Sequence, residues 1–136
     1  MNPMHDVTIL GLYQTDPSIS QYLLYNCFRI LRPLRWKYKL TINELIILNG
    51  MYIYNKLVSS DFSRNNIKTF VGYFNSNKIK YYVGSLIDKD CIYRSGVLNG
   101  YDRFKITPKG IEVVSDIDNC YDLALKKFLL DNNIEL

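Results

Sequence analysis

The sequence is poor in the residues that build metal centres and disulfide scaffolds. It has a single histidine, His5, and only three cysteines, Cys27, Cys91 and Cys120, at wide spacing. A zinc site needs about four such ligands close together, so we expect neither a metal nor a cofactor. An odd number of scattered cysteines also argues against a disulfide framework. We interpret the cysteines as small buried hydrophobes, with redox-sensitive thiols as the alternative.

The sequence also lacks long apolar runs and the motifs of common enzymes. No stretch approaches the ~18 uncharged apolar residues of a membrane span, and residues 1–16 contain no Lys or Arg, which a secretory signal needs. We therefore expect a cytoplasmic protein without membrane contact. There is no GxSxG, no phosphate-binding glycine loop and no HExxH. The prediction is that the protein is not an enzyme.

The overall composition is ordinary for a globular protein, but the charge is distributed unevenly along the chain. The 136 residues are 48% hydrophobic and 22% charged, which favours a single folded domain over residues 1–136. The net charge of +4 is concentrated in residues 62–110, which hold nine basic and three acidic residues, whereas residues 111–136 carry a net −4. Concentrated positive charge is typical of a protein that binds a polyanion. Judged from charge alone, a solvated, lysine-rich surface explains this concentration of basic residues equally well.

Apolar spacing and turn residues predict the order of elements. Residues 18–38 favour a helix that Pro33 kinks or ends. Thr41 and Glu44 form a capping box at the start of a second helix, and Asp61 or Ser63 caps a short third helix. A fourth helix follows over residues 76–88. Strands at 91–95 and 103–107 flank an Asn-Gly hairpin signal, and a last helix runs over 108–131 with Thr107 as its cap. Residues 7–10 fit either a strand or a helix.

A short helix, a tight turn and a second amphipathic helix make a helix-turn-helix, and a β-hairpin directly after it makes a winged one. The predicted fold class is therefore mainly α with a small β-hairpin. The winged-helix core spans residues 40–107, and the helices at 18–38 and 108–131 flank it. These two helices carry apolar stripes that one small core can bury only in part. The remaining apolar surface favours a homodimer.

The fourth helix is the predicted recognition helix. Ile79, Val83 and Leu86 point inward, so the opposite face and its flanks are polar or cationic. In this architecture such a face enters the major groove of DNA, while basic wing residues meet phosphates. A plain amphipathic helix beside a solvated hairpin would look similar. The candidate DNA-binding residues are Ser76, Asn77, Lys78, Lys80, Tyr81, Tyr82 and Ser85 on the helix, and Arg94, Arg103 and Lys105 on the wing.

Two further segments have alternative interpretations. Asp102 is expected to brace Arg103 or the turn rather than to contact DNA. The basic segment 29–39, with its interleaved aromatic residues, either touches a phosphate backbone or is a helix end whose charges reach into water.

The stretch from Leu40-Thr41 to Gly110 resembles the MarR-type winged-helix transcriptional regulators. The opening Leu40-Thr41, the recognition-helix segment 76–94 and the junction Ile106-Thr107-Pro108-Lys109-Gly110 carry the likeness, over about half of the chain. The pattern departs at Cys91, where the family usually has glycine. It also departs at Asp102-Arg103, which lies closer to Thr107 than the family's Asp-x-Arg motif. The resemblance implies a homodimer formed by the first and last helices. It also implies binding to a pseudo-palindromic DNA site, often relieved by a small ligand.

The residues and the resemblance together predict a sequence-specific regulator of transcription that binds double-stranded DNA as a homodimer, with an unidentified small-molecule effector left open. The alternative is a winged-helix protein–protein interaction module without DNA binding, because fold does not fix function. The twelve tyrosines fit that alternative, since tyrosine is favoured at protein interfaces.

Overall fold

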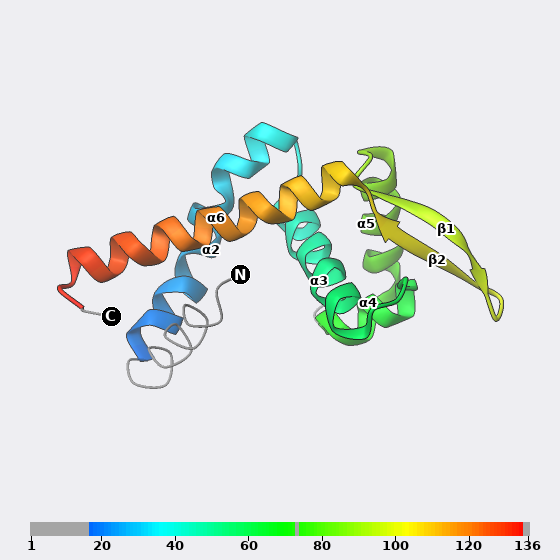
Figure 1. Cartoon of the computed structure of the whole chain (residues 1–136), viewed down its shortest axis with the longest axis horizontal. Helices are drawn as coiled ribbons and strands as arrows, with labels where there is room; N and C mark the ends of the chain where they lie inside the picture. The colour runs from blue at the N-terminus through cyan, green and yellow to red at the C-terminus, as the bar shows by residue number, and fades with distance from the viewer. Residues whose placement is uncertain (1–16, 73, 135–136) are drawn as a thin grey trace. The chain divides into compact units, whose positions relative to one another are not determined.

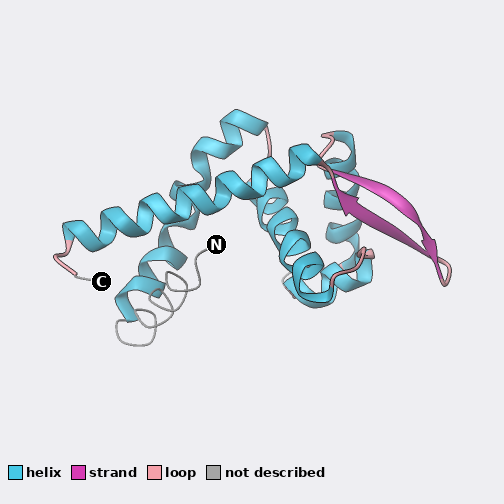
Figure 2. Ribbon diagram, in the orientation of Figure 1, coloured by secondary structure: helices cyan, strands magenta, loops and turns pink. Residues whose placement is uncertain are grey.

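The computed structural model describes residues 17–72 and 74–134, and the ambiguous segment 7–10 lies outside them. The described part is mainly helical with one antiparallel β-hairpin, which confirms the predicted fold class (Figures 1 and 2). In chain order its elements are α2 (Pro17–Tyr38), α3 (Ile42–Val58), α4 (Arg64–Val71), α5 (Ser76–Asp88), β1 (Ile92–Leu98), β2 (Tyr101–Ile106) and α6 (Pro108–Asp131).

The chain forms two compact units. One comprises residues 34–117 and contains α3, α4, α5 and the hairpin. The other combines residues up to 33 with residues from 118 onward. In this second unit Ile19, Leu125 and Leu129 form a buried cluster, and the rings of Tyr22 and Phe128 stack at 4.4 Å between centroids. Each unit therefore has apolar packing of its own.

The helix α2 continues through Pro33, contrary to the possibility that this proline ends it. A proline inside a helix lacks the N–H that would bond to the carbonyl four residues earlier. The loss is tolerated because Ile30, Leu31 and Leu34 on either side of Pro33 are buried, while Pro33 itself is exposed. Burial of the neighbouring apolar side chains outweighs one missing hydrogen bond.

The N-termini of α3, α4 and α5 are capped as their sequences indicate. Thr41 accepts a hydrogen bond from the backbone N–H of Glu44, whose carboxylate accepts one from the N–H of Thr41, so the predicted capping box is present. Ser63, and not Asp61, caps α4 in the same reciprocal way with Asn66. Asn75 accepts from the N–H of Lys78 at the start of α5. These side chains satisfy backbone donors that the helices leave open.

The hairpin is longer than the predicted strands and is tied to the rest of its unit. Its strands pair from Ile92 with Ile106 to Leu98 with Tyr101, and the turn is Asn99-Gly100, both with positive φ. That conformation is the one the Asn-Gly pair favours in a two-residue hairpin turn. Phe62, just before α4, forms an antiparallel bridge with Phe104 through two backbone hydrogen bonds of 3.2 and 2.8 Å. The bridge fixes the base of the wing against the α3–α4 connector.

The junction from the wing to α6 depends on a close backbone approach. Thr107 caps α6, as predicted, by accepting a hydrogen bond from the N–H of Gly110, and its hydroxyl donates to the carbonyl of Asp90. A Cβ on Gly110 would lie 2.2 Å from the carbonyl oxygen of Cys91. Only glycine fits where α6 begins beside the start of β1.

Candidate nucleic-acid interface

The outward side of α5 is polar and cationic, as predicted. Ile79, Val83 and Leu86 are buried in the unit's core. The exposed residues along the first half of the helix are Ser76, Asn77, Lys78, Lys80 and Tyr81. Tyr81 is 68% exposed, although its ring makes an edge contact with that of Tyr82. Residues 76–87 contain no carboxylate, and the acidic residue of α5, the exposed Asp88, lies at the C-terminal end of the helix.

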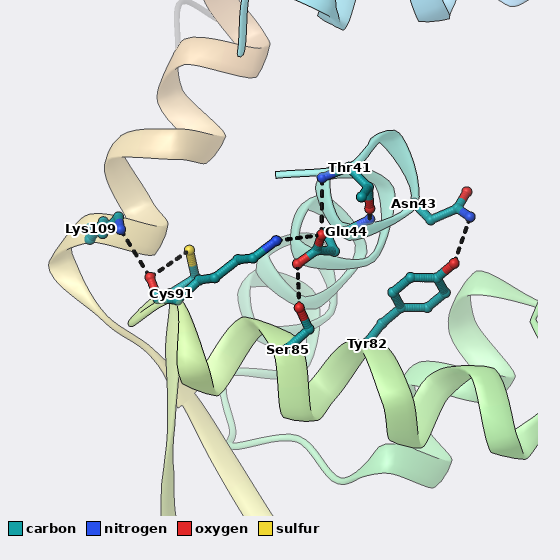
Figure 3. A network of polar contacts seen from close by, with 8 residues as sticks. Thr41, Asn43, Glu44, Tyr82, Ser85, Cys91 and Lys109 are labelled. Atoms are coloured by element: carbon teal, nitrogen blue, oxygen red, sulfur yellow. Dashed lines mark hydrogen bonds and ion pairs between the residues drawn. The ribbon is translucent and has the colours of Figure 1, made fainter. Parts of the chain in front are cut away.

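Tyr82 and Ser85 lie differently from the expectation that they belong to the outward face and its flank. The hydroxyl of Tyr82 accepts a hydrogen bond of 2.8 Å from the amide of Asn43, and Ser85 donates one of 2.8 Å to the carboxylate of Glu44 (Figure 3). Both partners belong to α3, and both α5 residues are half-buried. The two side chains therefore fix α5 against α3.

Glu44 is the centre of that contact. Its carboxylate is almost fully buried and also accepts a 2.9 Å bond from the ammonium of Lys89, which follows the end of α5 (Figure 3). Burial alone would raise the pKa of Glu44. The bonds from Lys89, from the N–H of Thr41 and from Ser85 outweigh burial, so the pKa lies below its ordinary value of 4.5. The group is charged at neutral pH and fully hydrogen-bonded.

The start of α5 receives a cation that sequence reasoning did not assign to the site. Lys68, in the last turn of α4, donates a 2.8 Å hydrogen bond from its exposed ammonium to the hydroxyl of Ser76. The sequence signal was present, because Lys68 contributes to the basic block 62–110. Its place beside Ser76 depends on the turn between the two helices.

The three basic wing residues have different surroundings. Arg94 forms an exposed 3.0 Å ion pair with Asp102. Asp102 was expected to brace Arg103 or the turn, and its partner is Arg94 instead. Lys105 is half exposed and lies 3.9 Å from a carboxylate oxygen of Asp61. These two cations remain at the surface of the hairpin.

Arg103 is half-buried and directed to the α3–α4 connector. Its guanidinium donates to the side chains of Asn66 and Ser60, at 3.4 and 3.2 Å, and to the backbone carbonyl of Asp61. The carboxylate of Asp61 in turn accepts a 2.6 Å bond from Ser95 at the bulge of β1. Arg103 and Asp61 therefore hold the wing to the connector from two sides.

The basic segment 29–39 is partly committed to contacts with α6. Lys37 donates a 2.9 Å bond to Asp116, and the Tyr38 hydroxyl donates to the same carboxylate. Burial, followed by the hydrogen bond to Asp116, raises the pKa of Tyr38 to about 12. Arg32, Arg35 and Trp36 are exposed. The segment is thus a helix end of which only part faces water.

The cysteines and the acidic residues add no second site to the part of the chain that the structure describes. Cys91 is buried, as predicted, and burial raises the pKa of its thiol, whereas Cys27 and Cys120 are half-buried. Among the described residues no cluster of three or more His, Cys, Asp or Glu side chains is placed to hold a metal ion. No described helix is long and apolar enough to cross a membrane.

Solved structures of transcription regulators share this arrangement. A mutant MepR from S. aureus bound to an oligodeoxyribonucleotide matches with a TM-score of 0.65 and 16% identity, over 86% of this chain and 80% of that one. The oxidized form of MarR from E. coli matches with a TM-score of 0.57 and 15% identity, over 97% and 83%. The chain has the winged-helix fold of the MarR-type regulators.

The organohalide-sensing transcriptional regulator RdhR, in its ligand-free form, has the same MarR-type fold, with a TM-score of 0.57 and 14% identity over 96% of this chain and 71% of that one. No family model and no curated protein matches the sequence. At such low identity the likeness to the MarR-type structures is one of fold.

Proposed function

We propose that this protein is a transcriptional regulator, not an enzyme, that binds double-stranded DNA sequence-specifically as a homodimer. The observation that carries the proposal is the exposed face of the first half of α5, which holds Lys78, Lys80 and Tyr81 and no carboxylate, next to a hairpin that bears further cations. S. aureus MepR, which has the same fold, has been solved in complex with DNA. The fold therefore permits this use of the surface.

In the proposed complex α5 lies in the major groove, whose width of about 12 Å admits a helix of 10–12 Å diameter. Recognition helices place their N-terminal residues on base edges, and here those residues are Ser76, Asn77 and Lys78. Lysine pairs with the acceptors of guanine and asparagine with adenine. Lys80 and Tyr81 extend the contact along the same exposed face.

Phosphate contacts come from the cations around this helix. Lys68, beside Ser76, and the wing residues Arg94 and Lys105 are exposed and suited to this role. An exposed ion pair such as Arg94 with Asp102 contributes only about 0–1 kcal/mol, so a phosphate can replace the carboxylate. Tyr82, Ser85 and Arg103 take part by holding α5 and the wing in place.

The homodimer is supported by apolar side chains that the second unit leaves exposed. In the parts of α2 and α6 that belong to it, Leu24, Tyr25, Phe28, Leu123 and Leu130 are all more than half exposed. Exposed apolar patches of this kind mark interaction sites in soluble proteins. A second copy of the chain is the proposed partner, and a small effector of unknown chemistry is compatible with it.

A gel-shift titration on the duplex recovered by selection from a random library tests the proposal. Lys78→Ala and Tyr81→Ala are expected to weaken binding to the selected site by about 1–3 kcal/mol each and to relax its sequence. Arg94→Ala is expected to weaken specific and non-specific binding alike. The matched control is Lys126→Ala, which removes a cation from an exposed pair on α6. Equal binding by all four variants would contradict the assignment of this face.

The second candidate function is a protein-docking domain, favoured by the exposed tyrosines Tyr81, Tyr93 and Tyr101. The dependence of DNA affinity on salt concentration distinguishes the two functions. Binding through several phosphates weakens steeply between low and moderate salt. A docking domain would show no affinity for duplex DNA at any salt concentration.

A further inference from the structure

Tyr81 is a large aromatic side chain on the exposed face of α5, and it is 68% exposed. On a helix, an exposed tyrosine exchanges between two staggered χ1 rotamers, because the third would clash with the preceding turn. A side chain that contacts a base from one of these rotamers loses conformational freedom on binding, and that loss weakens the complex. The strength of such a contact therefore depends on what holds the ring before DNA binds.

Tyr82 holds the ring of Tyr81. The two rings meet edge to face, with 5.2 Å between their centroids and 76° between their planes. Aromatic pairs prefer this arrangement at about 4.5–7 Å, because the positive edge of one ring faces the negative face of the other. Such pairs contribute about two- to tenfold in an equilibrium constant beyond the burial of their surface. The contact therefore favours the Tyr81 rotamer that maintains it.

The position of Tyr82 is itself fixed from two sides. Its hydroxyl accepts the 2.8 Å hydrogen bond from the amide of Asn43 on α3 (Figure 3). Its ring makes a second edge-to-face contact, at 5.6 Å and 66°, with the ring of Phe74. Phe74 is buried and lies in the turn between α4 and α5. A half-buried ring that is held by a hydrogen bond and by packing has one defined orientation.

We propose that Tyr82 is a positioning residue for sequence recognition, because it holds Tyr81 in the rotamer from which Tyr81 contacts a base. The inference rests on the proposed function and adds to it a residue that determines specificity through its neighbour. The chain of contacts runs from Asn43 on α3 through Tyr82 to Tyr81. Specificity at the base contacted by Tyr81 thus depends on a side chain on the flank of α5 that packs against α3.

This role differs from a general contribution to stability. A residue that only stabilised α5 would, when replaced, lower the free energy of unfolding and weaken specific and non-specific DNA binding together. A residue that orients Tyr81 affects the specific complex alone, because phosphate contacts carry no sequence information. The slope of log affinity against log salt should then stay unchanged, since the number of neutralised phosphates is the same.

The first experiment measures the χ1 rotamer populations of Tyr81 in the free protein by NMR three-bond couplings. A two- to tenfold preference gives about 70–90% of one rotamer in the wild type. Tyr82→Leu, which removes the supporting ring, should shift these populations towards equality. The measurement uses no DNA, so it tests the support of Tyr81 independently of the proposed function.

The second experiment is a gel-shift titration on the selected duplex and on a duplex of unrelated sequence. Tyr82→Leu should lose about two- to tenfold in affinity for the selected site and less than about twofold for the unrelated duplex. Tyr82→Phe keeps the ring but not the hydrogen bond to Asn43, and should lie between wild type and Tyr82→Leu.

The matched control is Tyr54→Leu. It removes a ring from another edge-to-face pair of the same unit, between Tyr54 on α3 and Phe70 on α4, at 6.0 Å and 71°. Its affinity for both duplexes should change by less than about twofold. A loss of specific binding equal to that of Tyr82→Leu would show that removing any such ring has this effect, and would overturn the inference.

A double-mutant cycle separates positioning from independent contact. In the Tyr81→Ala background, Tyr82→Leu should cause no further loss of specific affinity, because the ring that it supports is absent. Additive losses would overturn the inference. Circular dichroism checks that each variant is folded, and if Tyr82→Leu is not, Tyr82→Phe replaces it in the cycle.

Failure of the inference and failure of the proposed function give different results. If the wild type binds no duplex, the proposed function is wrong, and Tyr82 has no part in recognition whatever the rotamer populations. If the wild type binds DNA and Lys78→Ala weakens it, while Tyr82→Leu leaves both the rotamer populations and the specific affinity unchanged, the proposed function stands and the positioning role is wrong.

Discussion

Gly110 allows the start of α6 to lie against the start of β1 because it has no side chain. A Cβ there would meet the carbonyl oxygen of Cys91 at 2.2 Å and a methyl group of Ile106 at 2.6 Å. The carbonyl is held in place, because the N–H of Thr107 bonds to it at 3.0 Å. The glycine of the MarR-like junction is therefore required for the start of α6 to approach the start of the wing.

We predict that Gly110→Ala lowers the free energy of unfolding by about 2–4 kcal/mol, because the backbone must move to relieve the overlap. Urea unfolding followed by circular dichroism measures it. Gly84→Ala, on α5, is the control: among the described residues, nothing lies within 4 Å of the position that its Cβ would take. That change should therefore raise stability by about 0.5–1 kcal/mol through helix propensity. Equal stability of the two variants would contradict the argument.

Glu44 is the residue on which the position of α5 depends most. Glu44→Gln keeps an oxygen for the N–H of Thr41 but removes the charge that Lys89 requires. We predict a loss of about 1–3 kcal/mol at pH 7. The matched control is Asp102→Asn, which breaks the exposed pair with Arg94 and should change stability by less than about 1 kcal/mol.

At acid pH the free energies of unfolding of wild type and Glu44→Gln should become more similar. The folded-state pKa of Glu44 lies below its ordinary value of 4.5, so the unfolded chain takes up its proton first as the pH falls. The stabilisation is fully present above pH 4.5 and is lost as the pH falls through the folded-state pKa. Urea midpoints at about pH 7 and about pH 3.5 measure this convergence. A constant difference at both pH values would show that the carboxylate's charge plays no part.

At the scale of the element, α2 is the clearest case of packing overriding a local signal. Pro33 and Pro108 are both helical, but Pro108 occupies the first position of α6, where no backbone donor is missed. We predict that Pro33→Ala stabilises the protein by about 1–3 kcal/mol, because it restores a donor to the carbonyl of Arg29. Pro108→Ala should give no gain. Thermal unfolding compares the two, and a larger gain from Pro108→Ala would be inconsistent with this account.

The α5 helix shows both the reach and the limit of sequence periodicity. Spacing at about 100° per residue correctly placed Ile79, Val83 and Leu86 inside. It did not place Tyr82 and Ser85, because α5 packs on the core with one side and on α3 with a flank. Periodicity gives no information about the partner of a hydroxyl group, and both contacts are made by hydroxyls. Their partners, Asn43 and Glu44, lie 39 and 41 residues away in the sequence.

At the scale of the whole molecule, the exposed apolar side chains of the second unit predict self-association. Analytical ultracentrifugation at micromolar concentration should give a dimer. Leu130→Glu, which places a charge at a side chain now 78% exposed, should shift the protein towards monomer without unfolding it. Leu57→Glu on α3, 72% exposed in the other unit, is the control and should leave the dimer intact. A monomeric wild type would contradict the proposed assembly.

The sequence by itself determined the order of the elements, the caps Thr41 and Thr107, and the hairpin turn. These features depend on residues three or four positions apart, or on the φ preference of Asn-Gly, so a local pattern contains all that they need. The same locality explains why the fold class and the inner face of α5 were predicted correctly.

Only the tertiary structure decided which partner each cation takes. Lys68 contacts Ser76 and Arg94 contacts Asp102 at the surface, whereas the half-buried Arg103 is bound by groups 37 to 43 residues away. The physical reason is that a charged side chain takes whichever partner the fold brings within hydrogen-bond distance, and that choice is made by long-range packing. The number of basic residues can be counted in the sequence, whereas the partner of each basic side chain depends on the fold.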